Sequence, residues 1–194
     1  RLTGAQQRCI DDILTDLGRG APMNRLVQGD VGSGKTMVAA AAAYLAVKNG
    51  HQAAMMAPTE ILAEQHYAGL SRLLEPLGLR CTLLTGALTP KQKKERREQI
   101  AAGEADFIIG THALVSDTTT FRDLGLVITD EQHRFGVGQR SKLGAKGNDP
   151  HMLVMSATPI PRTLALILYG DLDVSILDEL PPGREPVDTF LVNE

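Results

Sequence analysis

Short runs of apolar residues alternate with longer, partly apolar segments along most of the chain. The runs lie at 25–27, 53–56, 81–84, 107–109, 126–128 and 152–155, and they are continuous, which is typical of strands buried on both faces. Between them, the alanine-rich segment 34–48 ends at Asn49-Gly50, and another segment begins at Thr89-Pro90 and ends at Gly103. These are helix-boundary signals. The alternation predicts an α/β fold, a doubly wound and mostly parallel sheet with helices on both faces.

The composition is that of an ordinary globular domain. Of the 194 residues, 43% are hydrophobic and 22% are charged, which excludes a disordered or collagen-like chain. A net charge of −3 argues against a surface that binds polyanions everywhere, so any contact with nucleic acid must be local. Cys9 and Cys81 have neither metal-ligand nor disulfide-framework spacing and predict idle thiols in a reducing compartment. The sequence shows no signal peptide and no apolar run near the roughly 18 residues of a membrane span.

The character of the sequence changes close to its end. The stretch 178–184 contains Pro181, Pro182 and Gly183 and predicts a linker. We therefore expect one domain over 1–178, with 179–194 forming a linker and the start of a further domain. Because the chain opens at Arg1 rather than Met, we expect it to be a piece of a longer protein.

One glycine-rich segment matches the phosphate-loop pattern G-x-x-x-x-G-K-[ST]. It follows the first predicted strand and opens a predicted helix, which is the context that the pattern requires. The segment reads Gly29-Asp30-Val31-Gly32-Ser33-Gly34-Lys35-Thr36. Its glycines let backbone N–H groups turn toward phosphate oxygens, and the helix N-terminus adds partial positive charge. We expect Lys35 to reach the β- and γ-phosphates and the Thr36 hydroxyl to bind Mg²⁺.

Two adjacent carboxylates, Asp130 and Glu131, follow another predicted strand. Asp130 is placed to hold Mg²⁺ through water, and Glu131 to polarise an attacking water. Beside a phosphate loop, the pair favours nucleotide hydrolysis over a solvated strand end. Three other classes compete with this interpretation. A small-molecule kinase is disfavoured by the consecutive acidic pair, and a GTPase needs an Asn-Lys-x-Asp string that the sequence lacks. A non-catalytic module has no need of Lys35 together with both carboxylates.

The string Asp130-Glu131-Gln132-His133 resembles the DExH box of superfamily-2 helicases, and the other first-lobe motifs of that family occur in order. The resemblance implies ATP and Mg²⁺ as cofactors. It implies that Gln6 reads the adenine edge and that catalysis involves Lys35, Asp130, Glu131, Gln132 and His133. It further implies contacts with the nucleic-acid backbone at Pro58-Thr59-Glu60 and Gly110-Thr111-His112, and coupling of hydrolysis to movement at Ser156-Ala157-Thr158.

The threonines of the nucleic-acid motifs give this reading some physical support. Thr59 and Thr111 each follow a predicted strand, and each is expected to cap a helix and to present a hydroxyl and free N–H groups to a phosphate. Two ordinary strand-to-helix turns are the alternative. The basic stretch 91–98, with five positive and two negative charges, either follows phosphates or, more commonly, forms a solvated helix face.

Hydroxyl and imidazole groups form a second candidate set. Ser156 and Thr158 are expected to bond the Gln132-His133 pair and so to link the γ-phosphate to the DNA face. Without the resemblance, His133 is better explained as a structural histidine. We interpret His51 and His151 as structural as well, and His112 is a weak candidate.

Longer strings narrow the resemblance to the RecG family of bacterial branched-DNA helicases. These strings lie at 130–137, 157–163 and 178–184. The alternative, the transcription-repair coupling factor, usually has Glu at the position of Gln132 and lacks the run at 179–184. The resemblance implies an ATP-dependent motor lobe, RecA-like in fold, that remodels forks and Holliday junctions in DNA repair and recombination. It implies a monomer in the bacterial cytoplasm at the nucleoid. It also implies a second RecA-like lobe and a wedge domain in the parent chain, without which this lobe hydrolyses ATP poorly.

Overall fold

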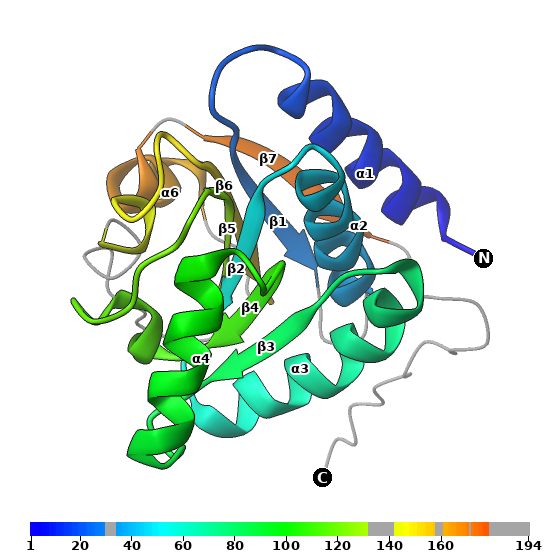
Figure 1. Ribbon diagram of the computed structural model, residues 1–194. Coiled ribbons are helices and arrows are strands. Elements are labelled where there is room, and N and C mark those ends of the chain that lie inside the picture. Colours follow the sequence, from blue (N-terminus) through cyan, green and yellow to red (C-terminus); the bar gives the residue numbers. More distant parts are fainter. Residues whose placement is uncertain (30–33, 132–141, 158–160, 171, 179–194) are drawn as a thin grey trace, which may run out of the picture.

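Parallel strands form a single sheet in the structure, a computed structural model that describes residues 1–29, 34–131, 142–157, 161–170 and 172–178 (Figure 1). The order across the sheet is β3-β4-β2-β5-β6-β1-β7, and every neighbouring pair is parallel. The strands are β1 (Asn24–Gly29), β2 (Gln52–Met56), β3 (Cys81–Leu84), β4 (Phe107–Gly110), β5 (Leu124–Glu131), β6 (His151–Ser156) and β7 (Asp173–Leu177). The predicted strands and their parallel arrangement are confirmed.

Helices connect the strands, and several of them begin at a threonine that caps the helix. They are α1 (Gly4–Leu17), α2 (Lys35–Lys48), α3 (Glu60–Leu74), α4 (Pro90–Ala102) and α6 (Arg162–Tyr169), with 3-10 helices η1 (Glu75–Leu77) and η2 (His112–Val115). Thr3 and Thr89 each form a capping box with the glutamine three residues later. Gly103 ends α4 at a φ of 75°, as predicted, while α2 begins one residue later than the predicted segment. None of the described helices is long and apolar enough to cross a membrane.

Helices cover both faces of the sheet, as the continuous apolar runs predict. Successive residues of a strand point to opposite faces. Met55 and Ile128 therefore pack in the core formed with α1, α2 and α3, whereas Met56 and Val127 pack in the core formed with α4 and η2. All of β2 is buried. The doubly wound α/β fold is confirmed. Because the strands are parallel, the loops that follow them all lie at the same edge of the sheet, the one formed by the carboxyl ends of the strands.

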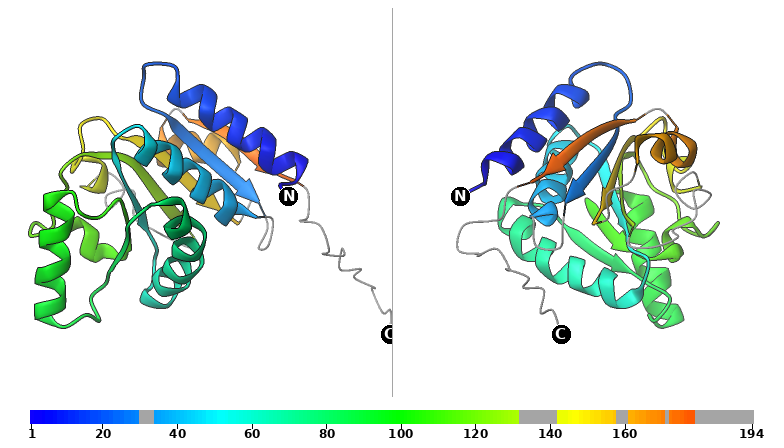
Figure 2. Two further views of the ribbon diagram at one scale, coloured as in Figure 1. Left: turned by 45° about the vertical axis from the view of Figure 1, so that its right-hand side comes forward. Right: turned by 180° about the vertical axis from the view of Figure 1, so that it is seen from behind.

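The strand β7 is missing from the predicted set. It pairs with β1 at the edge of the sheet, as the view from behind shows (Figure 2). Ser175 and Leu177 are buried, while Val174 and Ile176 are exposed. Because one face of this edge strand is left uncovered, its residues alternate in exposure and give no continuous apolar run. The domain boundary expected at 178 stays a prediction, since 179–194 lie outside the described residues.

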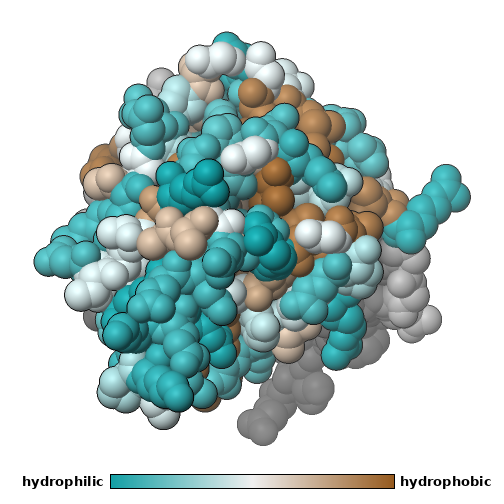
Figure 3. Space-filling view, viewed as in Figure 1, coloured by the Kyte–Doolittle hydropathy of each residue, from teal (hydrophilic) through white to brown (hydrophobic). Residues whose placement is uncertain are grey.

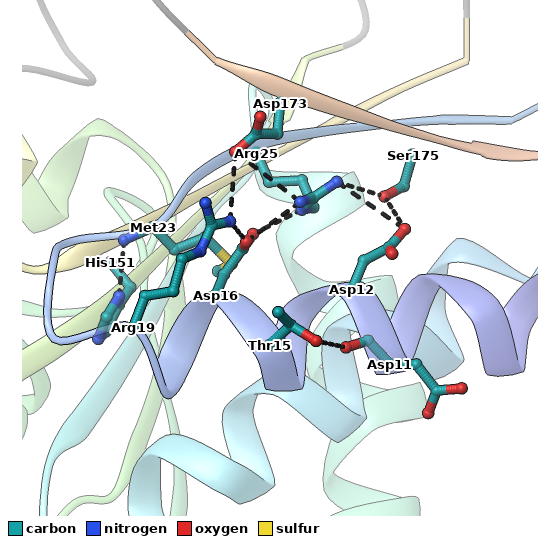
Figure 4. Close-up of polar contacts among 10 residues, drawn as sticks. All are labelled: Asp11, Asp12, Thr15, Asp16, Arg19, Met23, Arg25, His151, Asp173 and Ser175. Atoms are coloured by element: carbon teal, nitrogen blue, oxygen red, sulfur yellow. Dashed lines mark hydrogen bonds and ion pairs between the residues drawn. The ribbon is translucent and has the colours of Figure 1, made fainter.

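A buried ionic network attaches α1 to the sheet (Figure 4). Arg25 of β1 donates from Nε to Asp16 Oδ2 at 2.6 Å and from Nη2 to Asp16 Oδ1 at 3.1 Å. Its Nη1 donates to Ser175 Oγ of β7 at 2.8 Å, and this hydroxyl donates to Asp12 Oδ2 at 2.8 Å. One guanidinium thus joins a helix and two strands, and it fixes the helix whose other end reaches the phosphate loop.

Candidate functional site

The sheet order brings the predicted nucleotide residues together. In a parallel sheet, the carboxyl ends of all strands meet at one edge. Here β5, β6 and β1 are consecutive neighbours, and the register pairs Ser156 of β6 with both Gln28 of β1 and Glu131 of β5. The phosphate loop after β1, the carboxylates at the end of β5 and the motif after β6 therefore share one stretch of this edge.

Gln6 lies against the phosphate loop rather than in solvent. Its side chain is almost fully buried, its Oε1 accepts from the Thr3 backbone N–H at 2.8 Å, and its Nε2 donates to the Gly34 carbonyl at 3.3 Å. A Cβ at residue 34 would stand 1.9 Å from that Nε2, and Gly34 has a φ of 89°. The φ of residue 34 favours glycine there, and a Cβ at this position would also displace the end of the Gln6 side chain. The placement beside the loop agrees with the predicted adenine-reading role, which stays a prediction.

The described part of the phosphate loop supplies a cation and a hydroxyl. Lys35 Nζ donates to the Gly29 carbonyl at 2.6 Å, so the ammonium lies at the carboxyl end of β1. Thr36 is in the first turn of α2, where N–H groups have no partner within the helix. The predicted loop residues Asp30, Val31, Gly32 and Ser33 lie outside the described residues.

Asp130 is held by a histidine that the sequence analysis did not single out. The carboxylate is buried, and its Oδ2 lies 2.6 Å from Nε2 of His66 on α3. Asp130 has the same strand parity as Leu126 and Ile128, which pack on the side of α2 and α3. The sequence held one local sign of His66: it lies seven positions after Thr59, a spacing that places both residues on one face of a helix. Gln132, His133 and Thr158 lie outside the described residues, so the predicted bonds of Ser156 and Thr158 to that pair stay untested.

The predicted nucleic-acid residues occupy the adjoining stretch of the same edge. They follow β2 and β4, which are neighbours in the sheet, with β3 on the far side of β4. Thr59 is exposed and caps α3, with its hydroxyl accepting from the Leu62 N–H at 3.2 Å, so this predicted cap is confirmed. Gly110 closes β4, where an added Cβ would stand 2.1 Å from the Leu84 carbonyl oxygen. Glu60 reaches toward Gly86, whose added Cβ would lie 3.1 Å from the Glu60 carboxylate.

The prediction that Thr111 caps a helix with its hydroxyl is wrong. Only the four-residue 3-10 helix η2 follows, and the Thr111 side chain makes no cap bond to it. The hydroxyl is buried without a hydrogen-bond partner among the described residues, as is that of Thr129. The Thr111 N–H bonds the Leu84 carbonyl of β3 at 3.3 Å, so the residue still belongs to the sheet, and its side chain is buried there.

A basic pocket lies beside these residues. Its volume is about 420 Å³, and among the described residues no carboxylate lines it; the lining consists of Gly86, Lys93, Arg97, His112, Ala113, Val115, Ser116 and Lys142. Arg97 is oriented by a bond from Nε to Thr119 Oγ1 at 3.2 Å. The helix that supplies Lys93 and Arg97, α4, forms a hydrophilic surface at the lower left of Figure 3. The interpretation of 91–98 as a wholly solvated face is therefore incomplete, because one side of α4 borders a pocket beside His112.

The remaining histidines have structural contacts. The Met23 N–H donates to His151 Nδ1 at 2.8 Å. Burial lowers the pKa of His151, and repulsion from the nearby His51 lowers it further. His51 Nδ1 lies 3.0 Å from Asp123 Oδ2. These contacts agree with the structural roles predicted for His51 and His151, which stay predictions.

The donor set at the nucleotide end fits a magnesium nucleotide. Magnesium prefers oxygen ligands, and the Thr36 hydroxyl and the Asp130 carboxylate supply them. Lys35 and the N-terminal end of α2 suit phosphate oxygens. A nucleoside triphosphate can therefore lie along this edge, with its base toward Gln6.

Comparison with known proteins decides the family. The model of the DEAD/DEAH box helicase family matches residues 3–167. The chain belongs to this family. Members use ATP with magnesium, which fits the donor set, and the helicase family expected from the sequence is confirmed.

Similar proteins carry the RecG name. The chain is 57% identical over 192 residues to the ATP-dependent DNA helicase RecG of Synechocystis and 58% identical over 196 residues to that of Aquifex aeolicus. These matches cover 99% and 100% of this chain but 23% and 25% of those relatives. A structure of RecG bound to a three-way DNA junction matches 96% of this chain and 25% of that one, with a TM-score of 0.82 and 48% identity. The resemblance to RecG and the motor-lobe fold are confirmed, and the coupling-factor alternative is not favoured.

Proposed function

We propose that the chain is the ATP-binding first motor lobe of a DNA translocase that remodels forks and junctions. One observation carries the proposal: the strand order divides a single sheet edge into a nucleotide half after β1, β6 and β5 and a nucleic-acid half after β2, β4 and β3. The halves meet between β2 and β5, which are hydrogen-bonded neighbours. A change at the γ-phosphate and a contact with DNA thus act on adjacent strands.

In the nucleotide half, each residue has a distinct task. Gln6 offers an amide donor and acceptor to the adenine, and Lys35 neutralises charge on the β- and γ-phosphates. Thr36 and Asp130 hold the metal, and Glu131 orients the water that attacks. Bound magnesium supplies charge stabilisation at the phosphoryl oxygens. Gln132, His133, Ser156, Ala157 and Thr158 would communicate the state of the γ-phosphate.

In the nucleic-acid half, the contacts fit a phosphate backbone rather than base edges. The N-terminus of α3 at Thr59 presents N–H groups and a hydroxyl. The basic pocket beside His112 offers cations, with no carboxylate in the part of its lining that the structure describes. Such groups read charge and spacing, not sequence. DNA bound here would therefore be followed without sequence preference.

The preference for branched DNA rests on the relatives. The chain spans about a quarter of the length of the RecG proteins that it matches. We propose that a second RecA-like lobe completes the ATP site and that a wedge domain engages the branch, in a monomer acting at the bacterial chromosome. This lobe alone would then hydrolyse ATP slowly, since an arginine supplied from outside contributes about 10³–10⁵ in rate in related phosphoryl-transfer enzymes.

The test is ATP hydrolysis by the complete gene product with forked DNA, linear duplex or no DNA. Lys35→Ala should abolish hydrolysis, whereas Lys48→Ala, at the far end of the same helix, should leave it unchanged. Forked DNA should stimulate most. Hydrolysis that ignores DNA would overturn the assignment of the nucleic-acid half, and an active Lys35→Ala variant would overturn that of the phosphate loop.

A further inference from the structure

One contact at the nucleotide half has no role in the mechanism described so far. His66 Nε2 lies 2.6 Å from Asp130 Oδ2, and the two side chains are 16% and 6% exposed. His66 lies on α3 and Asp130 at the end of β5, so the two residues are 64 positions apart in the sequence. An ionised carboxylate only accepts hydrogen bonds, so the Nε2 atom carries the proton and donates it.

We propose that His66 is a positioning residue for Asp130: by donating to Oδ2, it fixes the carboxylate so that Oδ1 faces the hydrated magnesium ion. The proposal rests on the proposed function, in which Asp130 holds the metal through water. It assigns to α3 a role at the ATP site in addition to the predicted DNA contact at its first residue.

The geometry favours this role over simple anchoring of the helix. Helix α3 is already attached to the sheet by Ala63, Leu70 and Leu74, all of which are buried. A polar pair is not needed for that attachment. A carboxylate bonded at one oxygen loses rotational freedom about its terminal torsion, which is otherwise broad. Charge-assisted bonds of this length are among the strong ones in proteins.

The same helix also begins at the nucleic-acid half. Thr59 caps α3, and His66 follows two turns later on the same face, about 10 Å along the axis. Movement of α3 when its N-terminus engages a phosphate would change the position of His66 relative to Asp130. The contact is therefore well placed between the two halves of the edge.

The test compares two substitutions of equal length in the complete gene product. His66→Gln keeps an amide donor near the position of Nε2, and His66→Met fills similar space without a donor. Gln65→Met, on the exposed neighbouring position of the same helix, is the matched control. For each protein, binding of a fluorescent, non-hydrolysable ATP analogue is titrated against Mg²⁺ and is measured separately in EDTA.

We expect His66→Met to raise the half-saturating Mg²⁺ concentration about 10–100-fold, the usual effect of losing a residue that orients a metal ligand. His66→Gln should restore it to within about threefold, Gln65→Met should leave it unchanged, and binding in EDTA should be equal in all. The proposal is overturned if His66→Met and His66→Gln behave alike, or if binding in EDTA weakens as much as binding with Mg²⁺. Failure of the unsubstituted protein to bind the magnesium nucleotide at all would instead refute the proposed function.

Discussion

Replacing Arg25 by methionine is expected to destabilise the fold by about 3 kcal/mol. Methionine keeps the apolar stem but removes a guanidinium that makes hydrogen bonds to both Asp16 oxygens and to Ser175. The Asp16 side chain is 1% exposed, so water cannot replace the lost donors. Breaking such a pair costs about 3–5 kcal/mol, and we expect the lower end because Arg19 still pairs with Asp16.

Urea unfolding followed by circular dichroism measures this loss. With a slope of about 2 kcal/mol per molar urea, the midpoint of Arg25→Met should fall by about 1.5 M. The control is Arg8→Met on α1, the helix that Arg25 attaches to the sheet. Arg8 pairs with Asp178 at 3.1 Å, but the side chains are 61% and 65% exposed, and such pairs contribute about 0–1 kcal/mol.

A second variant distinguishes the cost of leaving a buried carboxylate unpaired from the cost of lost packing. In Arg25→Met/Asp16→Leu no buried carboxylate remains, so most of the lost stability should return, to within about 1 kcal/mol of the unsubstituted chain. A double variant as unstable as Arg25→Met would refute the electrostatic explanation. A midpoint shift for Arg25→Met no larger than that of the Arg8 control would refute the claim that the network holds α1.

Three further predictions concern other parts of the fold. Gly110→Ala should lower the free energy of unfolding by about 2–3 kcal/mol, because the Leu84 carbonyl leaves no room for a Cβ; a loss under 1 kcal/mol in urea would contradict this. Burial raises the pKa of Asp106, but bonds from Arg80 outweigh it and hold the pKa below its usual value. The resulting stability exists above about pH 4 and is lost as pH falls through the folded pKa. In a pH series of urea midpoints, Asp106→Asn should therefore be less stable by up to about 1 kcal/mol at pH 7 and should match the unsubstituted chain near pH 2. Burial raises the pKa of the Cys9 thiol to about 11, so iodoacetamide at pH 8 should label it slowly in the native chain and rapidly in urea; equal rates would show that Cys9 is accessible.

The sequence by itself determined the elements and the chemistry of single segments. The continuous apolar runs predicted six of the strands, and local boundary residues such as Thr89 and Gly103 predicted where α4 begins and ends. The phosphate loop and the carboxylate pair could also be found from the sequence. Each is a short string whose function depends on neighbours in sequence, and backbone geometry at that range is set by local sterics and hydrogen bonds.

The tertiary structure alone decided which of these segments meet. The order of strands places Ser156 between the phosphate loop and the carboxylates, and it separates the nucleotide half of the edge from the nucleic-acid half. It also turned the Thr111 side chain away from the role predicted for it. Contacts between segments dozens of residues apart depend on how strands pair and helices pack, and no local pattern encodes that choice.

Three polar contacts show the difference most clearly. Gln6 is buried against Gly34, Arg25 is paired with Asp16, and His66 bonds Asp130, yet the sequence around each residue gives no sign of that partner. Periodicity reports which face of an element is buried. It does not report which polar partner waits there, because that partner comes from another element and the bond exists only once both have packed.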